Sequence, residues 1–377
     1  MRFPEFTGEW KKYKVSELLD FYSTNSLSWE QLEYGTNTVK NLHYGLIHVG
    51  IPTMVDLSKD NLPNIKDGNM LRNYELCKEG DVAFADASED TNEVAKVVEF
   101  YNLEGQDVVC GLHTIHGRDN NELTVVGFKG YAFCSTIFHN QIRRIAQGTK
   151  IYSISTKNFS ECYIGIPCKA EQIKIATLLR FIDERIATQN KIIKKLETLI
   201  KALSHKLTTQ KKPNTLLKNC LVCHSSTLLE SHVKGKGQYP VFGATGICGY
   251  TDKSDISGDS ILIIKDGAGV GTTTYATGKY SVIGTLNYLQ STQEHYSLLY
   301  IYYSLKTFDF RPYITGMAIP HIYFRDYGKA KIWCPDIVEQ KRIATVLRTM
   351  DARLKINHSI LRNLTLQKQY LLSNLFI

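Results

Sequence analysis

Two cysteines and a histidine that are close in the chain have the spacing to bind zinc or carry haem. Cys220, Cys223 and His224 form the segment CLVCH, which matches c-type haem attachment, and a CxxC pair is also half of a zinc site. Haem attachment requires export, which nothing in the sequence supports. No second CxxC follows, and only Cys248 and His232 are within plausible reach. We therefore interpret these cysteines as buried thiols in a strand and predict no metal site.

Two further segments imitate catalytic or phosphate-binding motifs. The segment GAGVGT, which begins at Gly267, has Thr272 where GxGxxG needs its last glycine, and no lysine follows Gly271. We interpret it as a flexible turn that meets DNA or a helix. The segment from Pro335 to Lys341, PDIVEQK, resembles a nuclease PD…ExK set, but its spacing is too short. We interpret it as the start of a helix.

The remaining catalytic motifs are missing from the sequence. None of the nine prolines is adjacent to another, so the chain lacks the Pro-Pro loop with which amino-methyltransferases hold a flipped base. It also lacks H-E-x-x-H, a phosphate-binding lysine loop and a serine elbow. We therefore expect no catalytic residue in this chain.

The elements that would position any site are revealed by an internal repeat. The segment from Pro167 to Arg185 recurs from Pro335 to Arg353 with ten of nineteen residues identical and no gap. Upstream, the match continues from Gly148 to Pro167 alongside Gly316 to Pro335 at the same offset. The chain is therefore expected to be two units in tandem, each a mixed region of strands and short helices followed by a long helix. The boundaries that we predict are 1–166, 167–212, 213–335 and 336–377.

Both predicted helices carry an apolar stripe with steps of three and four residues, as a coiled-coil seam requires. The first stripe runs from Ile175 to Leu207 and the second, in the same register, from Ile343 to Leu375. We expect the two stripes to pack against each other; two separate core helices remain the alternative. Gln189 and Asn357 are the polar position that both stripes share, and they are predicted to pair near the middle of the helices, with hydration of both amides as the alternative.

The direction of the two helices follows from the connection between them. Residues 208–214 reach at most about 24 Å, whereas a helix of roughly 38 residues is about 57 Å long. A parallel pair would require the chain to travel back that length, so an antiparallel pair is expected. The predicted fold class is α+β, with two mixed α/β domains joined by two long antiparallel coiled-coil helices and an approximate two-fold relation.

Taken together, several phrases resemble the specificity subunit of type I restriction-modification systems over the whole chain. The phrases are GEWKKYKVSELLDF, GDVAFADASED, GLHTI, YPVFGATGICGY, GDSILIIKDGAGVG and both P-x-x-x-E-Q-x-x-I-A-T helix starts. The resemblance implies two target recognition domains that each read one half of a split site on double-stranded DNA. It also implies helices that hold two methyltransferase subunits, with S-adenosylmethionine on those subunits and restriction or translocase subunits joining through the complex. One departure is that the second domain opens with PNTLLKNCLVCHSS and lacks the tryptophan-led phrase of the first, which leaves its edge strand undetermined.

The charge distribution shows where such a chain could meet DNA. The whole chain has a formal net charge of +8, yet residues 1–166 carry −6 and residues 167–212 carry +7. Positive charge is concentrated on the helices, where it suits a phosphate backbone or acidic partners, although solvated lysines on an exposed face are a common cause. The first domain must therefore reach DNA through a local face.

Base readout favours Arg, Lys, Asn and Gln side chains in loops, together with aromatic contacts. In the first domain we predict one loop, GLHTIHGRDNNE, with a polar hairpin tip as the alternative. In the second domain the predicted loops are KGKGQYPVFG and the segment 267–279. The candidate DNA-binding residues are His113, Arg118, Asn120, Asn121, Lys234, Lys236, Gln238, Tyr239, Thr272, Thr273, Tyr275 and Lys279.

Polar residues outside the seam recur in both helices and suit one kind of partner bound twice. These partner-facing candidates are Glu171, Gln172, Arg180, Arg185, Glu339, Gln340, Arg348 and Arg353. The alternative is that some of them dock each helix start onto its own domain. A coiled-coil scaffold that tethers two proteins without reading DNA remains the second function.

Composition agrees with a cytoplasmic protein. The longest apolar runs are too short to cross a membrane, and the start of the chain lacks the apolar core of a signal peptide. The nine cysteines, unpaired in number and scattered, indicate reduced thiols.

Overall fold

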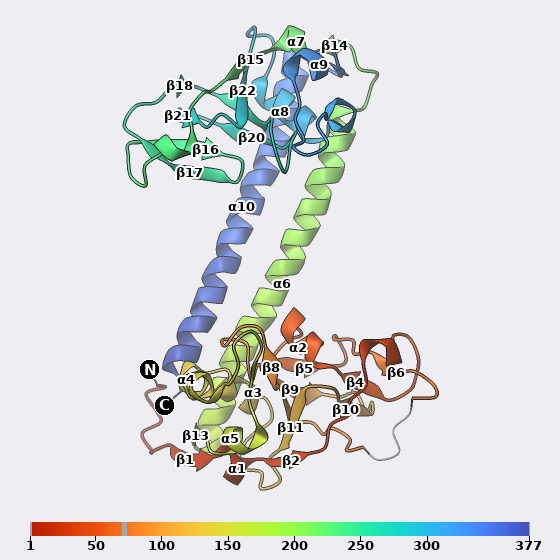
Figure 1. Cartoon of the computed structure of the whole chain (residues 1–377), viewed down its shortest axis with the longest axis vertical. Coiled ribbons are helices and arrows are strands. Elements are labelled where there is room, and N and C mark those ends of the chain that lie inside the picture. Colours follow the sequence, from red (N-terminus) through yellow and green to blue (C-terminus); the bar gives the residue numbers. More distant parts are fainter. Residues whose placement is uncertain (1, 70–73, 377) are drawn as a thin grey trace. The chain divides into compact units, whose positions relative to one another are not determined.

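The computed structural model describes residues 2–69 and 74–376 and divides the chain into two compact units. Unit 1 comprises Met1–Gln189 with Ile360–Ile377, and unit 2 comprises Asn190–Ser359. Each unit holds one mixed α/β domain, the start of one long helix and the end of the other (Figure 1). The predicted pattern of domain, helix, domain, helix is therefore present.

The domain of unit 1 is built around a five-stranded sheet. Its order is β2 (Asp20–Tyr22), β11 (Thr114–Arg118), β7 (Val82–Ala85), β9 (Val97–Asn102) and β5 (Met54–Asp56), and only the β5–β9 pair is parallel. Because side chains alternate along a strand, Val82 and Phe84 of β7 enter one core while Ala83 and Ala85 enter another. The central strand is therefore covered on both faces, which explains its unbroken apolar sequence.

A second sheet and several short helices complete this domain. The four-stranded sheet runs β10 (Val108–Cys110), β4 (Lys40–Leu42), β6 (Asn64–Ile65) and β3 (Leu32–Glu33), and a small pair joins β8 (Ala87–Ser88) to β12 (Tyr152–Ser153). The helices are α1 (Val15–Leu18), η1 (Trp29–Gln31), α2 (Tyr44–Val49), α3 (Lys129–Phe133), α4 (Thr136–Ile145) and α5 (Thr156–Ser160).

Unit 2 repeats this plan with two four-stranded sheets. One runs β15 (Leu221–Ser225), β22 (Leu286–Ser291), β19 (Ser260–Ile264) and β20 (Thr273–Ala276), and the other runs β17 (Gly246–Thr251), β16 (Tyr239–Gly243), β21 (Lys279–Val282) and β18 (Ile256–Ser257). In β19, Ile261 and Ile263 enter one core while Leu262 and Ile264 enter another, as in β7. The helices are α7 (Leu217–Cys220), η2 (Glu230–His232), α8 (Leu298–Lys306), η3 (Arg311–Tyr313) and α9 (Phe324–Tyr327).

In each domain the first strand pairs with the last, just before the long helix begins. In unit 1, β1 (Lys11–Lys14) is antiparallel to β13 (Tyr163–Ile166). In unit 2, β14 (Thr215–Leu216) is antiparallel to β23 (Lys331–Ile332). The edge strand that the sequence left undetermined is therefore present, although it is only two residues long.

The long helices are α6 (Lys169–Thr208) and α10 (Ile337–Asn374). In unit 1 the core contains Ile175 and Leu179 from the start of α6 together with Leu371 from the end of α10 and Leu375 directly after it. In unit 2 the core contains Ile343 and Leu347 from the start of α10, and Leu207 from the end of α6 packs against it. Each unit thus joins a helix start to a helix end, which confirms the antiparallel prediction.

The polar position of the stripe is buried on α6, where Gln189 is 8% exposed. Asn357 donates its side-chain amide to the carbonyl oxygen of Arg353 at 2.8 Å. The two residues belong to different units, so their pairing stays a prediction. Within the described residues, no helix has an apolar stretch long enough to cross a membrane.

Candidate nucleic-acid interface

The predicted loop GLHTIHGRDNNE is not a single loop. Its middle forms β11, which pairs with β2 and β7, and all five residues of that strand are buried. His113 precedes the strand, whereas Asn120 and Asn121 follow it, so they lie about 20 Å apart at roughly 3.3 Å per residue. The Asn120 amide donates to Asp20 Oδ2 at 2.7 Å and to the Tyr22 hydroxyl at 2.8 Å. Only one end of this segment can therefore contribute to any one contact surface.

Arg118 is the clearest correction among the DNA-binding candidates. Its side chain is 8% exposed, and its guanidinium donates to Asp81 Oδ2 at 2.8 Å, Glu75 Oε1 at 2.6 Å and the Leu76 carbonyl at 2.7 Å. His116 lies 2.7 Å from the same Asp81 carboxylate. Arg118 stabilises the domain from within and does not present donors to bases.

The hydrogen bonds from His116 and Arg118 determine whether the buried Asp81 carboxylate is charged. Burial by itself raises the pKa of Asp81, but hydrogen bonds from His116 and Arg118 outweigh burial and hold that pKa below its ordinary value. Asp81 is therefore ionised at neutral pH, and its charge is matched by Arg118.

His113 lies at the exposed end of β11 beside Tyr44, with ring centroids 5.2 Å apart. Its Nδ1 lies 3.2 Å from Asp86 Oδ1. The backbone of His113 has a φ of 55°, a left-handed conformation that a residue with a side chain rarely adopts. Ala95, Glu104 and Glu122 share this conformation, so it is the exposed ring of His113 beside Tyr44 that makes its surroundings the candidate surface on unit 1.

Four more rings extend this surface and were missed by the sequence analysis. Trp29 is 45% exposed and its ring lies 4.6 Å from that of His43, which lies 4.7 Å from Tyr44. His48 contacts Tyr44 at 5.9 Å on the other side. We call Trp29, His43, Tyr44, His48 and His113 the aromatic patch. Exposed rings of this kind can stack on bases or contact thymine methyl groups.

His43 is the buried member of the aromatic patch. Its Nδ1 accepts a hydrogen bond from the Gly45 amide at 3.1 Å. Burial, and then the nearby His113, lower the pKa of His43 below its ordinary value. His43 is therefore neutral at neutral pH and caps α2. The local signal that could have revealed the patch is the density of rings in HYGLIH, from His43 to His48.

In unit 2 the structure brings the loop at 234–239 together with Lys279. Strands β16 and β21 are parallel neighbours, so Tyr239 and Lys279 begin them side by side, and the Lys279 ammonium lies 6.0 Å from the Tyr239 ring centroid. Lys234 forms an exposed ion pair with Asp252 at 2.9 Å. Lys236 and Gln238 are exposed. We call Lys234, Lys236, Gln238, Tyr239 and Lys279 the lysine patch.

The remaining candidates of unit 2 lie on a different sheet. Thr273 and Tyr275 belong to β20, and Thr272 directly precedes it. The Tyr275 hydroxyl donates to Asp259 Oδ2 at 2.8 Å and its ring packs 5.5 Å from that of Tyr302. Gly271, with a φ of 87°, has no room for a side chain because an added Cβ would lie 2.9 Å from Phe310. The glycine segment 267–271 is a turn in which Gly271 packs against Phe310 while Ala268 and Gly269 are exposed, so the predicted turn is present and its flexibility stays a prediction.

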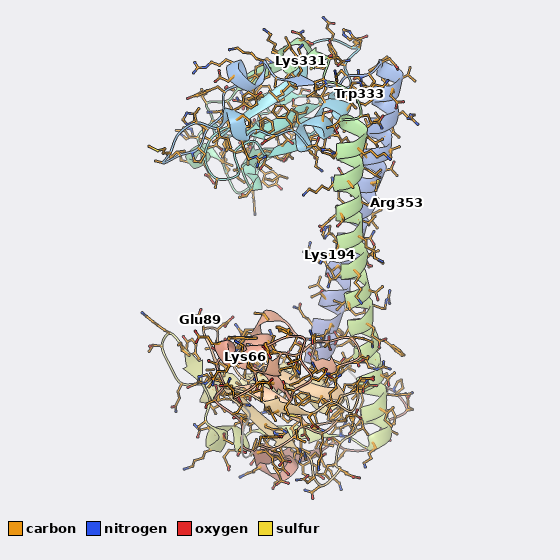
Figure 2. The ribbon with its side chains drawn as sticks, turned by 90° about the vertical axis from the view of Figure 1, so that its right-hand side faces the viewer. Lys66, Glu89, Lys194, Lys331, Trp333 and Arg353 are labelled. Atoms are coloured by element: carbon orange, nitrogen blue, oxygen red, sulfur yellow. The ribbon has the colours of Figure 1, made fainter. Side chains whose placement is uncertain are left out.

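Replacing Lys236 and Lys279 with alanine is expected to weaken binding to all DNA sequences alike. Each lysine that leaves a phosphate contact reduces the slope of log affinity against log salt by about one. The measurement is fluorescence anisotropy with duplex DNA between low and moderate salt. Lys331→Ala is the matched control, because Lys331 is exposed on β23, in another sheet of the same unit (Figure 2). If the slope of log affinity against log salt were equal for the double variant and wild type, the lysine patch would not be part of the DNA interface.

Gln172 and Gln340, predicted to face a partner, are instead buried at 0% and 2% exposure. Gln172 donates to the carbonyl oxygens of Leu123 and Pro167 at 3.0 and 2.9 Å and accepts from the Val125 amide at 2.8 Å. Its side chain therefore docks the start of α6 onto the domain of unit 1. For the glutamines, the alternative interpretation is therefore correct: they dock a helix start onto its own domain.

Gln340 repeats this docking in unit 2. It donates to the Pro335 carbonyl at 2.8 Å and accepts from the Ser297 amide at 2.9 Å. Glu171 is also buried, 1% exposed, in a two-bond ion pair with Arg2. Glu339 pairs with Arg342 of its own helix at 2.7 Å.

A second docking contact recurs in both units. The Tyr131 hydroxyl donates to Asp183 Oδ2 at 2.9 Å, and the Tyr303 hydroxyl donates to Asp351 Oδ2 at 2.9 Å. Burial and the carboxylate charge raise the pKa of both hydroxyls, so both remain protonated donors. Each domain is thus clamped to its long helix by a glutamine and a tyrosine.

The arginine candidates remain accessible. Arg185, Arg348 and Arg353 are exposed, and Arg180 pairs with Glu184 along the helix at 2.7 Å. Arg353 is exposed near the middle of α10 (Figure 2). These residues, unlike the glutamines, can meet another protein.

Gln340→Ala and Arg353→Ala are expected to separate docking from partner binding. Gln340→Ala leaves the Ser297 amide without its acceptor and should lower the free energy of unfolding by about 1–3 kcal/mol. Arg353→Ala should leave stability unchanged and weaken association with a partner protein that binds the exposed face of α10. Urea unfolding and partner titration measure the two effects. A large stability loss for Arg353→Ala would contradict the assignment.

Within the described residues, Cys220, Cys223 and His224 do not come together as a group of possible metal ligands. The Cys220 thiol is buried and lies 3.5 Å from the Leu216 carbonyl, and the His224 ring stacks on Tyr288 with centroids 4.9 Å apart. Burial raises the pKa of Cys220 to about 12 and that of Cys223 to about 11, so both remain thiols. All nine cysteines of the chain are free.

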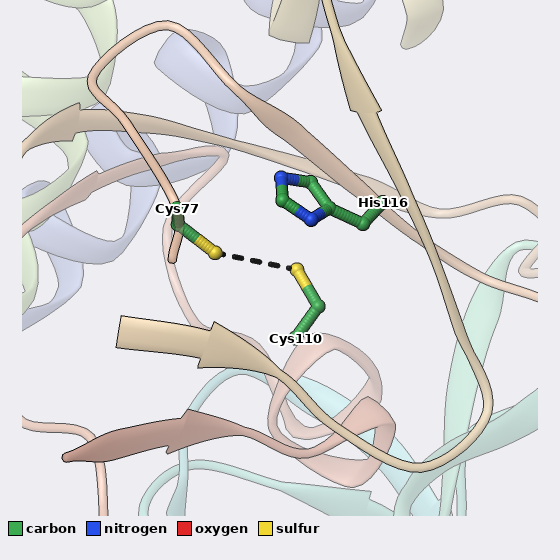
Figure 3. Close-up of side chains that lie close together, drawn as sticks. All are labelled: Cys77, Cys110 and His116. Carbon is green, nitrogen blue, oxygen red and sulfur yellow. Dashed lines mark hydrogen bonds between the residues drawn. The ribbon is translucent and has the colours of Figure 1, made fainter. Parts of the chain in front are cut away.

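A different group has the spacing of metal ligands. Among the described residues, the His, Cys, Asp and Glu side chains that could share an ion are Cys77, Cys110 and His116 (Figure 3). The sequence analysis missed this group, because Cys77 is 33 residues from Cys110. The segment CGLHTIH, from Cys110 to His116, was the local signal that could have pointed to it.

Comparison with known proteins identifies both halves of the chain. Residues 60–198 and 222–366 each match the type I restriction modification DNA specificity domain. A comparison with curated proteins finds no match.

Two solved structures share the fold. The S subunit of a type I restriction-modification system from M. genitalium has a TM-score of 0.69 and 18% sequence identity, covering 100% of this chain and 99% of that one. A chain from a study of complex assembly and conformational transition of the type I R-M system has a TM-score of 0.59 and 16% identity, covering 98% and 97%. These likenesses show the shared fold, and the two matched domains, which cover more than half of the chain, show that it belongs to the type I restriction modification DNA specificity family, whose members are the DNA-recognition and not the catalytic component.

Proposed function

We propose that each domain reads one half of a bipartite DNA site and that the two long helices hold two copies of a methyltransferase subunit. The observation that carries the proposal is that the two units share one arrangement of strands, helices and docking contacts. Both have paired first and last strands, a doubly covered central strand and a glutamine and tyrosine clamp onto a long helix. Because the same arrangement occurs in both units, the chain is suited to bind two DNA half-sites and two copies of one partner protein.

The proposed partners follow from this arrangement and from the family. The methyltransferase subunits would carry S-adenosylmethionine, and restriction or translocase subunits would join through them. A solved neighbour is described in terms of complex assembly of the type I R-M system, which supports the same organisation here. The proposal places the protein in the cytoplasm, where its nine free thiols would remain reduced.

The contact surfaces that we propose for DNA are the aromatic patch of unit 1 and the lysine patch of unit 2. The first supplies exposed rings on a domain whose net charge is negative, and the second supplies lysines around an aromatic ring. Affinity would come mainly from lysines on phosphates, and sequence preference from contacts to base edges.

Native mass spectrometry with the methyltransferase subunit of the same system tests the assembly. At saturating partner we expect one chain with two methyltransferase subunits, and the same complex should shift duplex DNA in a gel. A stable one-to-one complex would contradict the repeated surface. A two-to-one complex that does not discriminate between DNA sequences would favour a scaffold instead.

A further inference from the structure

Two thiols and an imidazole from three separate segments meet inside the domain of unit 1 (Figure 3). The Cys77 and Cys110 sulfur atoms are 3.5 Å apart, and the ligand atoms of the two cysteines and His116 all lie within 4.8 Å of one another. The three residues are buried, with exposures of 6%, 2% and 0%. The DNA-recognition function uses none of them.

His116 is oriented as metal-binding histidines are. Its Nε2 lies 2.7 Å from the Asp81 carboxylate, an arrangement in which that nitrogen carries the ring proton. Its Nδ1 is buried and has no hydrogen-bond partner. A carboxylate behind one nitrogen and a free lone pair on the other form the carboxylate–histidine–metal arrangement.

The distances and charges fit zinc. Two thiolates that bind one Zn²⁺ at about 2.3 Å in a tetrahedron have their sulfur atoms about 3.8 Å apart, close to the observed separation. A disulfide would require about 2.05 Å. Two thiolates also cancel the charge of Zn²⁺, and Arg118 already balances Asp81, so binding would bury no net charge. A monovalent ion such as Cu⁺ would leave one negative charge uncompensated.

We propose that Cys77, Cys110 and His116 bind one Zn²⁺, with a water molecule in the fourth position. On binding, both thiols release their protons to solvent and the sulfurs and His116 Nδ1 donate electron pairs to the ion. The ion would join the segment before β7 to the end of β10 and the middle of β11. Cys110 and His116 flank the turn that carries His113, so zinc would brace the aromatic patch.

Metal content of the full-length chain tests the proposal directly. After loading with zinc and desalting, elemental analysis should find close to one zinc per chain. Cobalt substitution should give thiolate-to-metal charge-transfer absorption and the visible bands of tetrahedral Co²⁺. A folded wild-type chain that retains less than about a tenth of an equivalent and shows no cobalt bands would overturn the site.

Two variants assign the ligands. Cys110→Ser should lower the bound zinc at least tenfold, whereas Cys220→Ser, which changes an equally buried cysteine of unit 2, should retain it. Equal zinc in both variants would place the metal elsewhere and contradict the assignment. A wild-type mass lower by two hydrogens, with Cys77 and Cys110 linked in a peptide map, would show a disulfide and also overturn it. If Cys110→Ser fails to fold, the wild-type measurements decide the question alone.

Discussion

Exchanging residues 213–335 for the corresponding segment of a relative with another DNA site is expected to change one half of the recognised site and preserve the other. Methylation at the original site should fall to the non-specific level, a loss of roughly 10³-fold or more in preference. The reason is that each domain has its own cores and sheets, as the proposed reading of one half-site by each domain requires.

The structure provides junctions for this exchange, because both ends of the segment meet. The Asn214 side chain donates to the Cys334 carbonyl and accepts from the Cys334 amide, each at 2.8 Å. The Asn214 amide donates to the Ile332 carbonyl at 3.0 Å. A replacement that keeps Asn214 and Cys334 should therefore preserve the connection to both long helices.

Methylation sequencing of DNA modified by the reconstituted complex measures the outcome. An exchange of the same segment from a relative with an identical site is the control and should leave the pattern unchanged. If both halves of the site changed together in the test exchange, reading by separate domains would be refuted.

Arg118→Met is expected to lower the free energy of unfolding of unit 1 by roughly 3–5 kcal/mol. Methionine retains much of the side-chain volume but leaves Asp81, 2% exposed, without its cation. An unpaired buried carboxylate costs far more than an ion pair at the surface contributes. Urea unfolding measures the loss, followed by a probe in unit 1 for this variant and by a probe in unit 2 for its control.

Arg311→Met is the matched control. Arg311 pairs with Asp309 at 2.8 Å, but its side chain is 86% exposed, so its removal should leave stability unchanged. If both variants lost a comparable free energy of unfolding, burial of the Arg118–Asp81 ion pair would not be the cause of the loss in Arg118→Met.

The same network predicts a pH dependence of stability. Because the pKa of Asp81 is lower in the folded state, its contribution is present above its ordinary pKa near 4 and is lost as the pH falls towards the folded value. Arg118→Met should therefore lose less stability than wild type when the pH is lowered from about 5 to 3. A larger acid-induced loss in the variant would contradict this sign.

The sequence by itself determined the tandem organisation and the antiparallel helices. Ile175 and Leu179 repeat in register with Ile343 and Leu347, and the short connection after Thr208 left one direction for the second helix. Such features are readable because helix periodicity and chain reach depend on neighbours along the chain. The absence of catalytic motifs was likewise visible in the sequence and agrees with the family.

Only the tertiary structure decided which polar residues are exposed and so available to contact DNA or a partner protein. Arg118 and Gln172 are of types that read DNA or bind partners, yet both are buried by segments far away in the sequence. Cys77, Cys110 and His116 meet for the same reason, because β11 pairs with β7 while Cys77 bonds to β10. Burial and proximity arise from long-range strand pairing, to which residue type and local spacing are insensitive; the sequence could therefore propose polar candidates but could not show which of them are buried.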